Sequence, residues 1–363
     1  MRSRLQSIWY RHARPPLLLR PLSRAFGLAI RARRAAYARG WRHAQRLERP
    51  VVVVGNLSVG GSGKTPLVIW LVAQLRAVGL ASGIVLRGYG GAAARGREPQ
   101  LVQPDSDPAV VGDEALLLRR RTGELVAVGR DRVRAARLLI AAGVNVIVAD
   151  DGLQHLALPR DFEIGVIDGE RGLGNGYLLP AGPLREPRER LDSVDAVVIN
   201  GEGRFWAQSA AARRPGERRT EATPAAGAPA ASAAGRPFTM RLRGERLMPL
   251  TGAGQAVALS SFAGQRVHAL AGIGHPERFF AQLRAAGLEL IEHAFPDHHR
   301  YRAHELSFGE SLPVLMTEKD AVKCHGFGGP AYWYLPVTAS FADPEAVALL
   351  GRLRRALELK GRA

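Results

Sequence analysis

The sequence predicts an α/β fold, with a mostly parallel sheet that carries helices on both faces and a second, smaller α/β domain. A glycine-rich loop at 58–65 lies between an apolar run and a helical segment. Apolar runs then alternate with helical patterns as far as residue 200, which is typical of parallel sheets. A shorter alternation of the same kind follows a segment rich in Ala, Pro and Gly. Together these features predict a P-loop NTPase-type domain followed by a second domain.

The run Val51–Gly55 predicts the first buried strand, because five apolar or small residues stand between a proline and the glycine-rich loop. Further strands are expected at 83–86, 125–128, 144–149, 162–167 and 196–199, with helices after residue 65 and at 112–121 and 130–142. In the second domain, strands are expected at 267–270, 288–295, 313–316 and 332–335, with a helix at 276–286.

The chain therefore divides into four predicted parts. Residues 1–49 form a basic N-terminal segment, and 50–200 form a nucleotide-binding domain. Residues 201–237 lack apolar periodicity and are interpreted as a linker or loop. Residues 238–363 form the second α/β domain, which is expected to close the active-site cleft.

The N-terminal segment holds thirteen arginines against one acidic residue, Glu48, so most of the formal net charge of +18 is concentrated there. After Pro15-Pro16, apolar residues recur at three- and four-residue steps between the arginines, which predicts an amphipathic helix. The arginines interrupt every apolar run that could span a membrane or serve as a signal peptide. We expect this helix to lie on an anionic membrane surface. A basic helix packed on its own domain stays as the alternative.

The overall charge points to an anionic partner, which could be nucleic acid, a membrane or a phosphorylated ligand. Nucleic acid is disfavoured because the charge is concentrated in one segment and no known recognition module is present. Cys324 is the only cysteine, so an internal disulfide is excluded and a reducing compartment is the simplest interpretation.

The loop between the first strand and helix has the composition of a phosphate-binding loop. Its backbone N–H groups and the following helix N-terminus are expected to bind nucleotide phosphates, with Lys64 on the β/γ-phosphates and Thr65 on Mg²⁺. Lys64 is one of only four lysines among 51 basic residues, which makes its place after Gly63 informative. The first position of the usual pattern is Ser58 and not glycine. The loop consists of Ser58, Val59, Gly60, Gly61, Ser62, Gly63, Lys64 and Thr65.

Asp150 and Asp151 follow the strand predicted at 144–149. A carboxylate at such a strand end, in a protein with a phosphate loop, is the usual second anchor for Mg²⁺. Asp168 ends another strand and is a weaker candidate for the same task. A solvated turn is the alternative for the adjacent pair.

Two further segments contain candidates for proton transfer. Asp113 precedes an apolar helix, where it could cap the helix or accept a proton from an attacking hydroxyl. His298 belongs to Phe295-Pro296-Asp297-His298-His299 and could assist such a carboxylate, ligate zinc or lie in a polar turn. Zinc is poorly supported because no cysteine pair accompanies the histidines. Thr317-Glu318-Lys319-Asp320 weakly resembles a guanine-binding N-K-x-D loop but lacks the asparagine, so we interpret it as a strand-to-helix turn.

Six segments taken in order resemble the tetraacyldisaccharide 4'-kinase family of lipid A biosynthesis, over nearly the whole chain except the Ala/Pro-rich insert. Position Ser58 fits this resemblance, because the loop of that family lacks the first glycine. The six segments begin with the loop 55–66 and continue with Arg87-Gly88-Tyr89-Gly90, Gly112-Asp113-Glu114, Asp150-Asp151-Gly152-Leu153-Gln154-His155, Leu179-Pro180-Ala181-Gly182-Pro183-Leu184-Arg185-Glu186 and Phe295-Pro296-Asp297-His298-His299.

The resemblance implies a kinase that uses ATP and Mg²⁺. It would transfer the γ-phosphoryl group to the 4'-hydroxyl of an acylated glucosamine disaccharide 1-phosphate and so form the 4'-phosphorylated precursor lipid IVA. Such an enzyme would be peripheral, on the cytoplasmic face of the bacterial inner membrane. No nucleic acid and no obligate protein partner are expected.

The resemblance also implies roles for individual residues. Lys64 and Thr65 would bind phosphate and Mg²⁺, and Asp113 would be the base in an acid/base pair with His298. This implication favours catalysis over helix capping alone for Asp113. The metal shell would consist of Thr65, Asp150, Asp151 and Glu186, and further substrate contacts are expected from Arg87, Tyr89, Gln154 and Asp297.

Two rival functions stay open at this point. The nearest is another P-loop small-molecule phosphotransferase or a GTPase, which a nucleotide competition assay would separate from an ATP-dependent kinase. The other is a nucleic-acid-associated NTPase, which the confinement of the charge to one amphipathic segment disfavours.

Overall fold

The computed structural model describes residues 7–10, 15–202, 236–251, 254–308, 311–324, 326 and 329–361. The chain divides into two compact units, each assembled from separated stretches. The first unit comprises Met1–Lys64, Asn145–Arg241 and Ser340–Ala363, and the second comprises Thr65–Val144 and Leu242–Ala339. The predicted linker at 201–237 falls almost entirely outside the described residues. The predicted domain boundaries stay a prediction.

The first unit contains a run of parallel strands in the order β8-β7-β6-β1-β5. Every residue of the four strands from β7 to β5 is buried, as expected for strands covered on both faces. Because the strands are parallel, their carboxyl ends meet at one edge of the sheet. The strands are β1 (Val51–Gly55), β5 (Val146–Asp150), β6 (Phe162–Asp168), β7 (Ala196–Asn200) and β8 (Phe238–Arg243).

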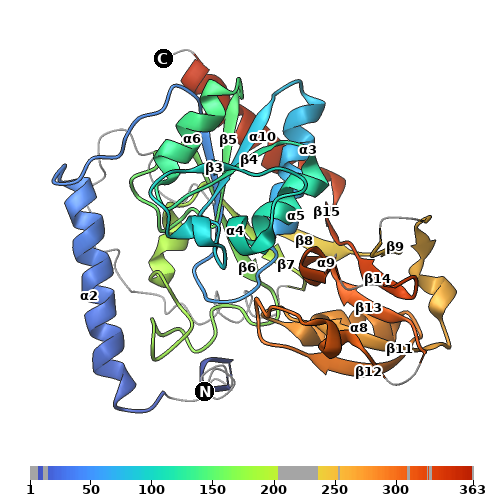
Figure 1. The fold of residues 1–363 in the computed structure, drawn as a ribbon. Helices are drawn as coiled ribbons and strands as arrows, with labels where there is room; N and C mark the ends of the chain where they lie inside the picture. The colour runs from blue at the N-terminus through green and yellow to red at the C-terminus, as the bar shows by residue number, and fades with distance from the viewer. Residues whose placement is uncertain are drawn as a thin grey trace. The chain divides into compact units, whose positions relative to one another are not determined.

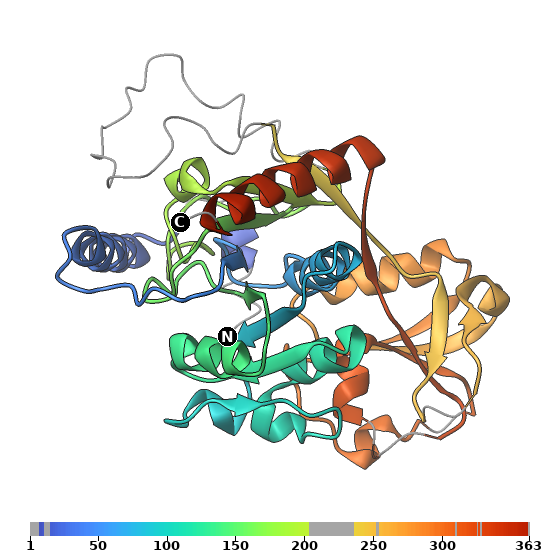
Figure 2. The same ribbon diagram turned by 90° about the horizontal axis from the view of Figure 1, so that it is seen from above.

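Helix α10 (Asp343–Gly361) covers this part of the sheet and follows strand β15 (Thr338–Phe341) (Figure 2). Glu345 accepts a hydrogen bond from the backbone N–H of Thr239 in β8, at 3.2 Å. The guanidinium of Arg352 lies 5.0 Å from the ring of Phe238 and donates to the carbonyl of Asp195. The C-terminal helix is therefore attached to the first unit by hydrogen bonds and a cation–π contact.

Helix α2 (Leu19–Ala38) is the predicted N-terminal helix and belongs to the first unit (Figure 1). Its small residues contact the protein: Ser23 Oγ donates to the carbonyl of Leu178 at 2.8 Å, and a Cβ on Gly27 would lie 2.9 Å from Leu178 Cδ1. Among the described residues, no helix has both the length and the apolar character needed to cross a membrane. Large apolar side chains on this helix and just before it stay exposed, namely Leu17, Leu18, Leu22 and Leu28.

The second unit begins within helix α3 (Lys64–Ala77) and contains strands β2, β3 and β4, which follow this helix. Strands β2 and β4 are parallel, and β3 pairs with β4 in the antiparallel sense. Helix α6 begins two residues after its predicted start, because Asp131 Oδ1 caps it by accepting from the N–H groups of Val133 and Arg134. These elements are β2 (Ser82–Leu86), β3 (Gln100–Leu101), α4 (Pro108–Val111), α5 (Asp113–Thr122), β4 (Leu125–Val128) and α6 (Arg132–Ala141).

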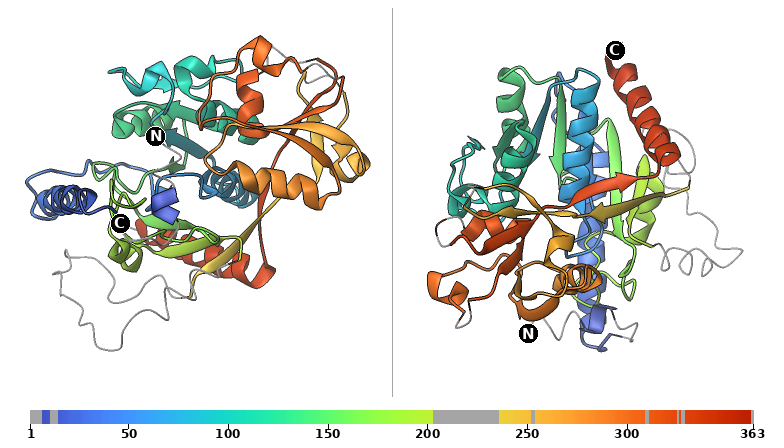
Figure 3. Two further views of the ribbon diagram at one scale, coloured as in Figure 1. Left: turned by 90° about the horizontal axis from the view of Figure 1, so that it is seen from below. Right: turned by 90° about the vertical axis from the view of Figure 1, so that its right-hand side faces the viewer.

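The second unit also contains a sheet, drawn from yellow to orange-red in Figure 3. Its strand order is β10-β9-β14-β13-β11-β12. Alternate residues of its strands enter two cores, as the period of two requires. Val267 and Leu315 pack with α8, whereas Leu270 and Met316 pack on the side of α9. The elements are β9 (Arg246–Pro249), β10 (Val257–Ala258), β11 (Arg266–Ala271), α8 (Pro276–Ala285), β12 (Glu289–Ala294), β13 (Val314–Thr317), α9 (Glu318–Cys324) and β14 (Tyr332–Leu335).

The predicted fold class is confirmed, and the predicted strands and helices recur within one or two residues of their expected ends. Several short elements were not predicted from the sequence. A two-residue strand such as β3 carries no periodicity, and the pairing of β8 with β7 depends on chain beyond the predicted linker. Helix α10 was also not predicted, whereas α9 begins at the predicted strand-to-helix turn.

Gly55 provides a test of packing at the end of β1. A Cβ at this position would lie 2.7 Å from Leu153 Cγ and 3.1 Å from the backbone nitrogen of Leu153. We expect Gly55→Ala to lower the free energy of unfolding by about 1–3 kcal/mol, because the neighbouring loop must shift. Urea denaturation of the purified protein measures this change.

Gly351→Ala is the matched control for that substitution. Gly351 lies in α10, and the nearest atom to its added Cβ is the mobile end of Arg355 at 3.7 Å. This variant should be as stable as the parent or more stable, because alanine favours helix. Equal loss of stability in the two variants would contradict the packing argument.

Candidate active site

The phosphate loop, Ser58–Thr65, is fixed by backbone hydrogen bonds to a segment more than 100 residues later. The N–H of Val59 donates to the carbonyl of Pro183 at 2.8 Å, and the N–H of Arg185 donates to the carbonyl of Leu57 at 2.6 Å. Ser58 forms an antiparallel bridge with Leu184 between these bonds. Its φ angle is not in the left-handed region, so this position does not require glycine.

Gly63 meets two requirements that only glycine satisfies. Its φ is +89°, and a Cβ would lie 2.5 Å from Asn200 Nδ2. Asn200 is the last residue of β7, and its amide donates to the carbonyl of Ser62 at 3.1 Å. The strand end therefore holds the loop just before Lys64.

Asn56, the first residue after β1, is a functional candidate that our sequence analysis missed. It is completely buried, and its Oδ1 accepts from Lys64 Nζ at 3.2 Å. Its own amide donates to the carbonyl of Gly60, and Gln154 Nε2 donates to its backbone carbonyl at 3.2 Å. Asn56 thus orients the loop lysine. Its position directly after a buried strand was the available signal.

The two adjacent aspartates differ in their surroundings. Asp150 is buried at the end of β5, whereas Asp151 has a left-handed φ of 53° and a partly exposed carboxylate. Arg185 donates to both oxygens of Asp151, at 2.7 and 2.8 Å, and Lys64 Nζ lies 3.6 Å from Oδ1. Arg185 also donates to Asn56 Oδ1. Sequence analysis missed the role of Arg185, although it adjoins the predicted ligand Glu186.

Glu186 and Gln154 are joined to helix α2. Arg34 Nη1 lies 3.5 Å from the buried Glu186 carboxylate, and Arg33 donates to the carbonyl of Gln154 at 3.0 Å. Burial and the positive charge of Arg190 lower the pKa of Arg34, and the Glu186 carboxylate opposes that effect. One face of the basic helix therefore contacts two residues of the predicted site.

The predicted metal shell consists only of oxygen donors, which is the donor type that Mg²⁺ prefers. In the part of the chain that the structure describes, no group of three or more His, Cys, Asp or Glu side chains is arranged to hold a metal ion. Mg²⁺ commonly binds one or two carboxylates together with water and substrate phosphates. The chemistry of Thr65, Asp150, Asp151 and Glu186 fits such a site, and their metal-binding role stays a prediction.

Asp168 has a simpler explanation. Its Oδ1 accepts hydrogen bonds from the backbone N–H groups of Glu170 and Arg171, at 3.0 and 3.1 Å. This is the geometry of a side-chain cap on the turn that follows β6. The carboxylate therefore stabilises a loop.

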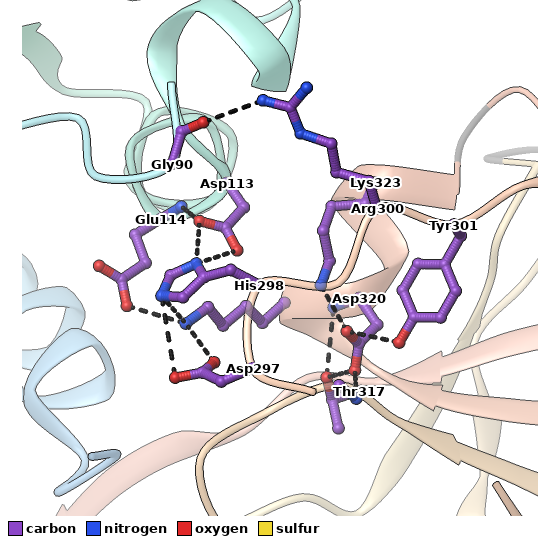
Figure 4. Close-up of polar contacts among 12 residues, drawn as sticks. Gly90, Asp113, Glu114, Asp297, His298, Arg300, Tyr301, Thr317, Asp320 and Lys323 are labelled. Carbon is purple, nitrogen blue, oxygen red and sulfur yellow. Dashed lines mark hydrogen bonds and ion pairs between the residues drawn. The ribbon is translucent and has the colours of Figure 1, made fainter. Parts of the chain in front are cut away.

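The second unit brings Asp113 and His298 together although they lie far apart in the sequence (Figure 4). His298 Nδ1 lies 3.0 Å from Asp113 Oδ2 and 3.2 Å from Oδ1. Gly112, and not Asp113, is the N-cap of α5, and Asp113 Oδ1 accepts from the N–H of Glu114. Capping alone therefore does not account for this carboxylate.

His298 lies in a tight turn whose contacts hold it in an unfavourable backbone conformation. Its φ of 62° is left-handed, which costs a non-glycine residue about 1–2 kcal/mol. The N–H of His299 donates to the carbonyl of Pro296, and Arg300 donates to the carbonyl of Gly90 at 3.2 Å (Figure 4). The surrounding turn therefore presents His298 to Asp113.

The zinc hypothesis finds no support at these histidines. His299 Nε2 contacts both oxygens of Glu305 at 3.1 Å, and His293 Nε2 lies 3.0 Å from His268 Nδ1. His298 is engaged with Asp113. Each of these three histidines thus contacts another side chain through one of its ring nitrogens.

The remaining predicted substrate residues lie near this pair or on the surface of the same unit. Tyr89 is exposed, and its ring centroid lies 5.0 Å from that of His298. Arg87 is exposed at the end of β2. Asp297 Oδ1 lies 3.3 Å from the Nζ of Lys319. Lys319 is the second residue of α9, which follows β13 directly, as the predicted strand-to-helix turn requires. The contact of these residues with a substrate stays a prediction.

The electrostatics of the pair favour an ionised Asp113. Burial alone would raise the pKa of Asp113, but the hydrogen bond to His298 and the charges of Lys319 and Lys323 lower it to about 2. Burial lowers the pKa of His298, but the hydrogen bond to Asp113 and the negative charges of Asp113 and Asp297 together raise it above the ordinary value of 6.5. Asp113 is therefore a carboxylate at neutral pH, and the pKa of His298 lies above its ordinary value.

Comparison with known proteins decides the family. The model of the tetraacyldisaccharide-1-P 4'-kinase family matches residues 16–355. The chain belongs to this family. Among its relatives, the tetraacyldisaccharide 4'-kinase of Alkalilimnicola ehrlichii is 52% identical over 342 residues, covering 93% of each chain. That of Methylobacillus flagellatus is 46% identical over 356 residues, covering 98% of this chain and 97% of its own.

A solved structure extends the comparison to the fold. The chain is similar to LpxK from Aquifex aeolicus, an "apo" form crystallised in complex with ATP, with a TM-score of 0.70 and 27% identity. The match covers 93% of this chain and 98% of the other. The family and kinase class that six sequence segments predicted are thus confirmed. The roles of individual site residues stay predictions.

The titration of His298 predicts the pH dependence of catalysis. The pair accepts a hydroxyl proton best when His298 is neutral, and its pKa is raised above 6.5. The kcat/KM for phosphoryl transfer should therefore fall as the pH is lowered through a value above 6.5. His298→Gln should remove this acid limb along with most of the activity.

The measurement is kcat/KM between pH 5 and pH 9 for the parent and the variant, which spans the expected limb. ATP affinity measured over the same range controls for protonation of the nucleotide. An acid limb at the same pH in both proteins would show that another group titrates.

Proposed function

We propose that this chain transfers the γ-phosphoryl group of ATP to the 4'-hydroxyl of an acylated glucosamine disaccharide 1-phosphate, forming the 4'-phosphorylated precursor lipid IVA. The observation that carries the proposal is the contact of Asp113 with His298, at 3.0 Å, within a chain of this kinase family. A buried carboxylate paired with an imidazole is suited to activate a sugar hydroxyl.

The phosphate loop binds the donor nucleotide in this proposal. Support comes from the ATP found in the related Aquifex aeolicus structure and from the loop lysine that Asn56 orients. Lys64 binds the β/γ-phosphates, and backbone N–H groups of the loop bind phosphate oxygens. Thr65, Asp150, Asp151 and Glu186 would hold Mg²⁺, which when bound neutralises charge on the phosphates.

Asp113 accepts the proton of the acceptor hydroxyl. The 4'-oxygen forms a bond to the γ-phosphorus while the bond from that phosphorus to the β–γ bridging oxygen breaks, and ADP leaves. The proton is held at the Asp113 carboxylate, and the Nδ1–H of His298 keeps that carboxylate oriented. Asp113 is buried, which limits the access of water to its carboxylate.

The N-terminal helix supports a substrate held in a membrane. Leu17, Leu18, Leu22 and Leu28 are between 56% and 85% exposed, beside the exposed arginines of the same helix. Apolar side chains next to basic ones suit an interface of anionic lipids. We place the protein on the cytoplasmic face of the inner membrane, where its arginines contact lipid headgroups.

The direct test of the activity uses γ-labelled ATP, Mg²⁺ and the acylated disaccharide, followed by lipid extraction. We expect label in the lipid with the parent protein. Asp113→Asn should lower transfer by roughly 10²–10⁴-fold, because the amide cannot act as a base, while ATP affinity stays unchanged. GTP in place of ATP should support little transfer, which separates the kinase from a GTPase.

Asp107→Asn is the matched control for this substitution. Asp107 caps the short helix α4 by accepting from the N–H of Ala109, and asparagine caps helices equally well. Its activity should match the parent. Unchanged transfer by Asp113→Asn would refute Asp113 as the base, and unlabelled lipid with the parent would refute the activity itself.

The membrane role of α2 has a separate test. Removing residues 1–40 should weaken membrane association more than ATP binding, but this deletion also removes Arg34 from Glu186. Replacing Leu17, Leu18, Leu22 and Leu28 by Gln avoids that loss. We expect this variant to float poorly with phosphatidylglycerol vesicles while keeping its ATP affinity, because apolar burial in the interface is lost.

Val347→Gln is the control for exposed apolar area, since Val347 is 71% exposed on α10. It should float as the parent does. Equal recovery of the leucine variant with the vesicles would exclude these leucines from membrane contact.

A further inference from the structure

Helix α9 contains two of the four lysines in a chain that otherwise uses arginine for its positive charge. Lys319 and Lys323 lie in its first two turns. The sequence pattern around Lys319 was interpreted above only as a strand-to-helix turn. The contacts of this turn give it a more specific role.

Asp320 fixes the start of α9. Its side chain is completely buried and accepts from Thr317 Oγ1 at 2.6 Å and from Tyr301 Oη at 3.0 Å (Figure 4). The N–H of Gly272 also donates to it, and Lys323 Nζ lies 2.7 Å from Oδ1. These bonds tie the first turn of α9 to strands β11 and β13, so the position of the neighbouring Lys319 is well determined.

The ammonium group of Lys319 lies among three acceptors. Its Nζ is 3.1 Å from Glu114 Oε1, 3.3 Å from Asp297 Oδ1 and 3.5 Å from His298 Nε2. An ammonium has three donors and no acceptor, so these three positions match its bonding capacity. Burial alone would lower the pKa of Lys319, but the charges of Glu114, Asp113 and Asp297 raise it, so it stays charged.

The position of Lys319 constrains the tautomer of His298. Because the Asp113 carboxylate can only accept, His298 Nδ1 must carry the hydrogen between them. Nε2 of the neutral ring is then an acceptor, and Lys319 is a donor at the outer limit of hydrogen-bond distance. Asp297 Oδ2, at 3.8 Å from Nε2, has the opposite influence, because a carboxylate favours a protonated Nε2.

The charged and titratable groups around His298 can be assigned to every neighbouring element. Helix α5 contributes Asp113 and Glu114, and the loop after β2 contributes Tyr89. Asp297 belongs to the same turn as His298, and α9 contributes Lys319, with Lys323 further along. Lys319 is the cation of this set that contacts Nε2.

We propose that Lys319 is a positioning residue of the kinase, which holds His298 in its neutral Nδ1–H tautomer and restrains Asp297 and Glu114 around it. This inference rests on the proposed role of the Asp113–His298 pair. Lys319 acts through His298 and does not itself touch the reacting atoms. Its loss leaves Asp297 unopposed at Nε2, so His298 becomes protonated at higher pH and the pair becomes a weaker base.

The test compares Lys319→Met with the parent in the full-length protein. We expect kcat to fall roughly 10- to 100-fold near neutral pH, as part of the roughly 10²–10⁴-fold that a general base supplies, with little change in the KM for ATP. The acid limb of the pH profile should move to higher pH. Lys319→Arg, which keeps the charge, should recover part of the rate.

Nuclear magnetic resonance of protein labelled with ¹⁵N-histidine gives a readout that needs no substrate. His298→Gln assigns the His298 signals. We expect the Nδ1–H tautomer in the parent, a higher His298 pKa in Lys319→Met and a lower one in Asp297→Asn. Opposite shifts from removing a cation and an anion are not expected from a loss of structure.

Arg121→Met is the matched structural control. Arg121 Nη1 bonds Glu318 Oε1 at 3.0 Å, so this pair also joins α5 to α9 but does not contact His298. It should leave the His298 titration and the pH profile unchanged. An unshifted His298 titration in Lys319→Met, or an equal shift in Arg121→Met, would overturn the proposal.

The two proposals can fail separately. A parent protein that leaves the lipid unlabelled refutes the kinase activity, whereas the His298 titration still decides the role of Lys319. If Lys319→Met does not fold by circular dichroism, Asp297→Asn and Lys319→Arg carry the test. An unchanged His298 pKa in Asp297→Asn would then contradict the inference that Lys319 and Asp297 shift this pKa in opposite directions.

Discussion

The burial of the parallel strands is the constraint on which the first unit depends. Strands β1, β5, β6 and β7 have no exposed residue, so their backbone polar groups are satisfied within the sheet. Apart from Glu163 near the start of β6, the polar side chains of these four strands stand at their carboxyl ends. Asn56, Asp150 and Asn200 lie at or just after such ends, and two of them hold the phosphate loop through Lys64 and Ser62. The loop geometry is therefore a consequence of sheet burial.

In each unit, one residue of the predicted site has a strained backbone conformation and a charged or titratable side chain. Asp151 and His298 are the non-glycine residues with positive φ in the described part of the chain. Such conformations persist only where the surroundings fix them. Arg185 holds Asp151 with two bonds to its carboxylate, and Asp113 holds the ring of His298. In each case these contacts fix the direction of a carboxylate or an imidazole ring, although the backbone conformation of that residue costs free energy.

The sequence predicted strands β1, β5, β6 and β7 well because each is a largely apolar run, and it singled out Lys64, Asp151 and His298 because each follows a predicted strand in a recognisable pattern. It did not predict Arg185 or Lys319. Their roles depend on partners that are distant in the sequence, such as Asn56 for Arg185 and Glu114 for Lys319. Periodicity carries no information about such contacts. The pairing of β8 with β7 was missed for the same reason.

The choice of lysine at position 319 follows from geometry in a chain rich in arginine. Arginine presents a planar fork that suits one carboxylate held by two parallel bonds, as Arg185 holds Asp151. Lys319 meets three acceptors, one on α5 and two in the turn that contains His298, and one of them is a ring nitrogen. A compact ammonium with three rotatable donors matches that arrangement, whereas a guanidinium would engage one carboxylate and leave the imidazole uncovered. Because lysine is rare in this chain, its occurrence at positions 64 and 319 indicates that each position favours an ammonium group over a guanidinium.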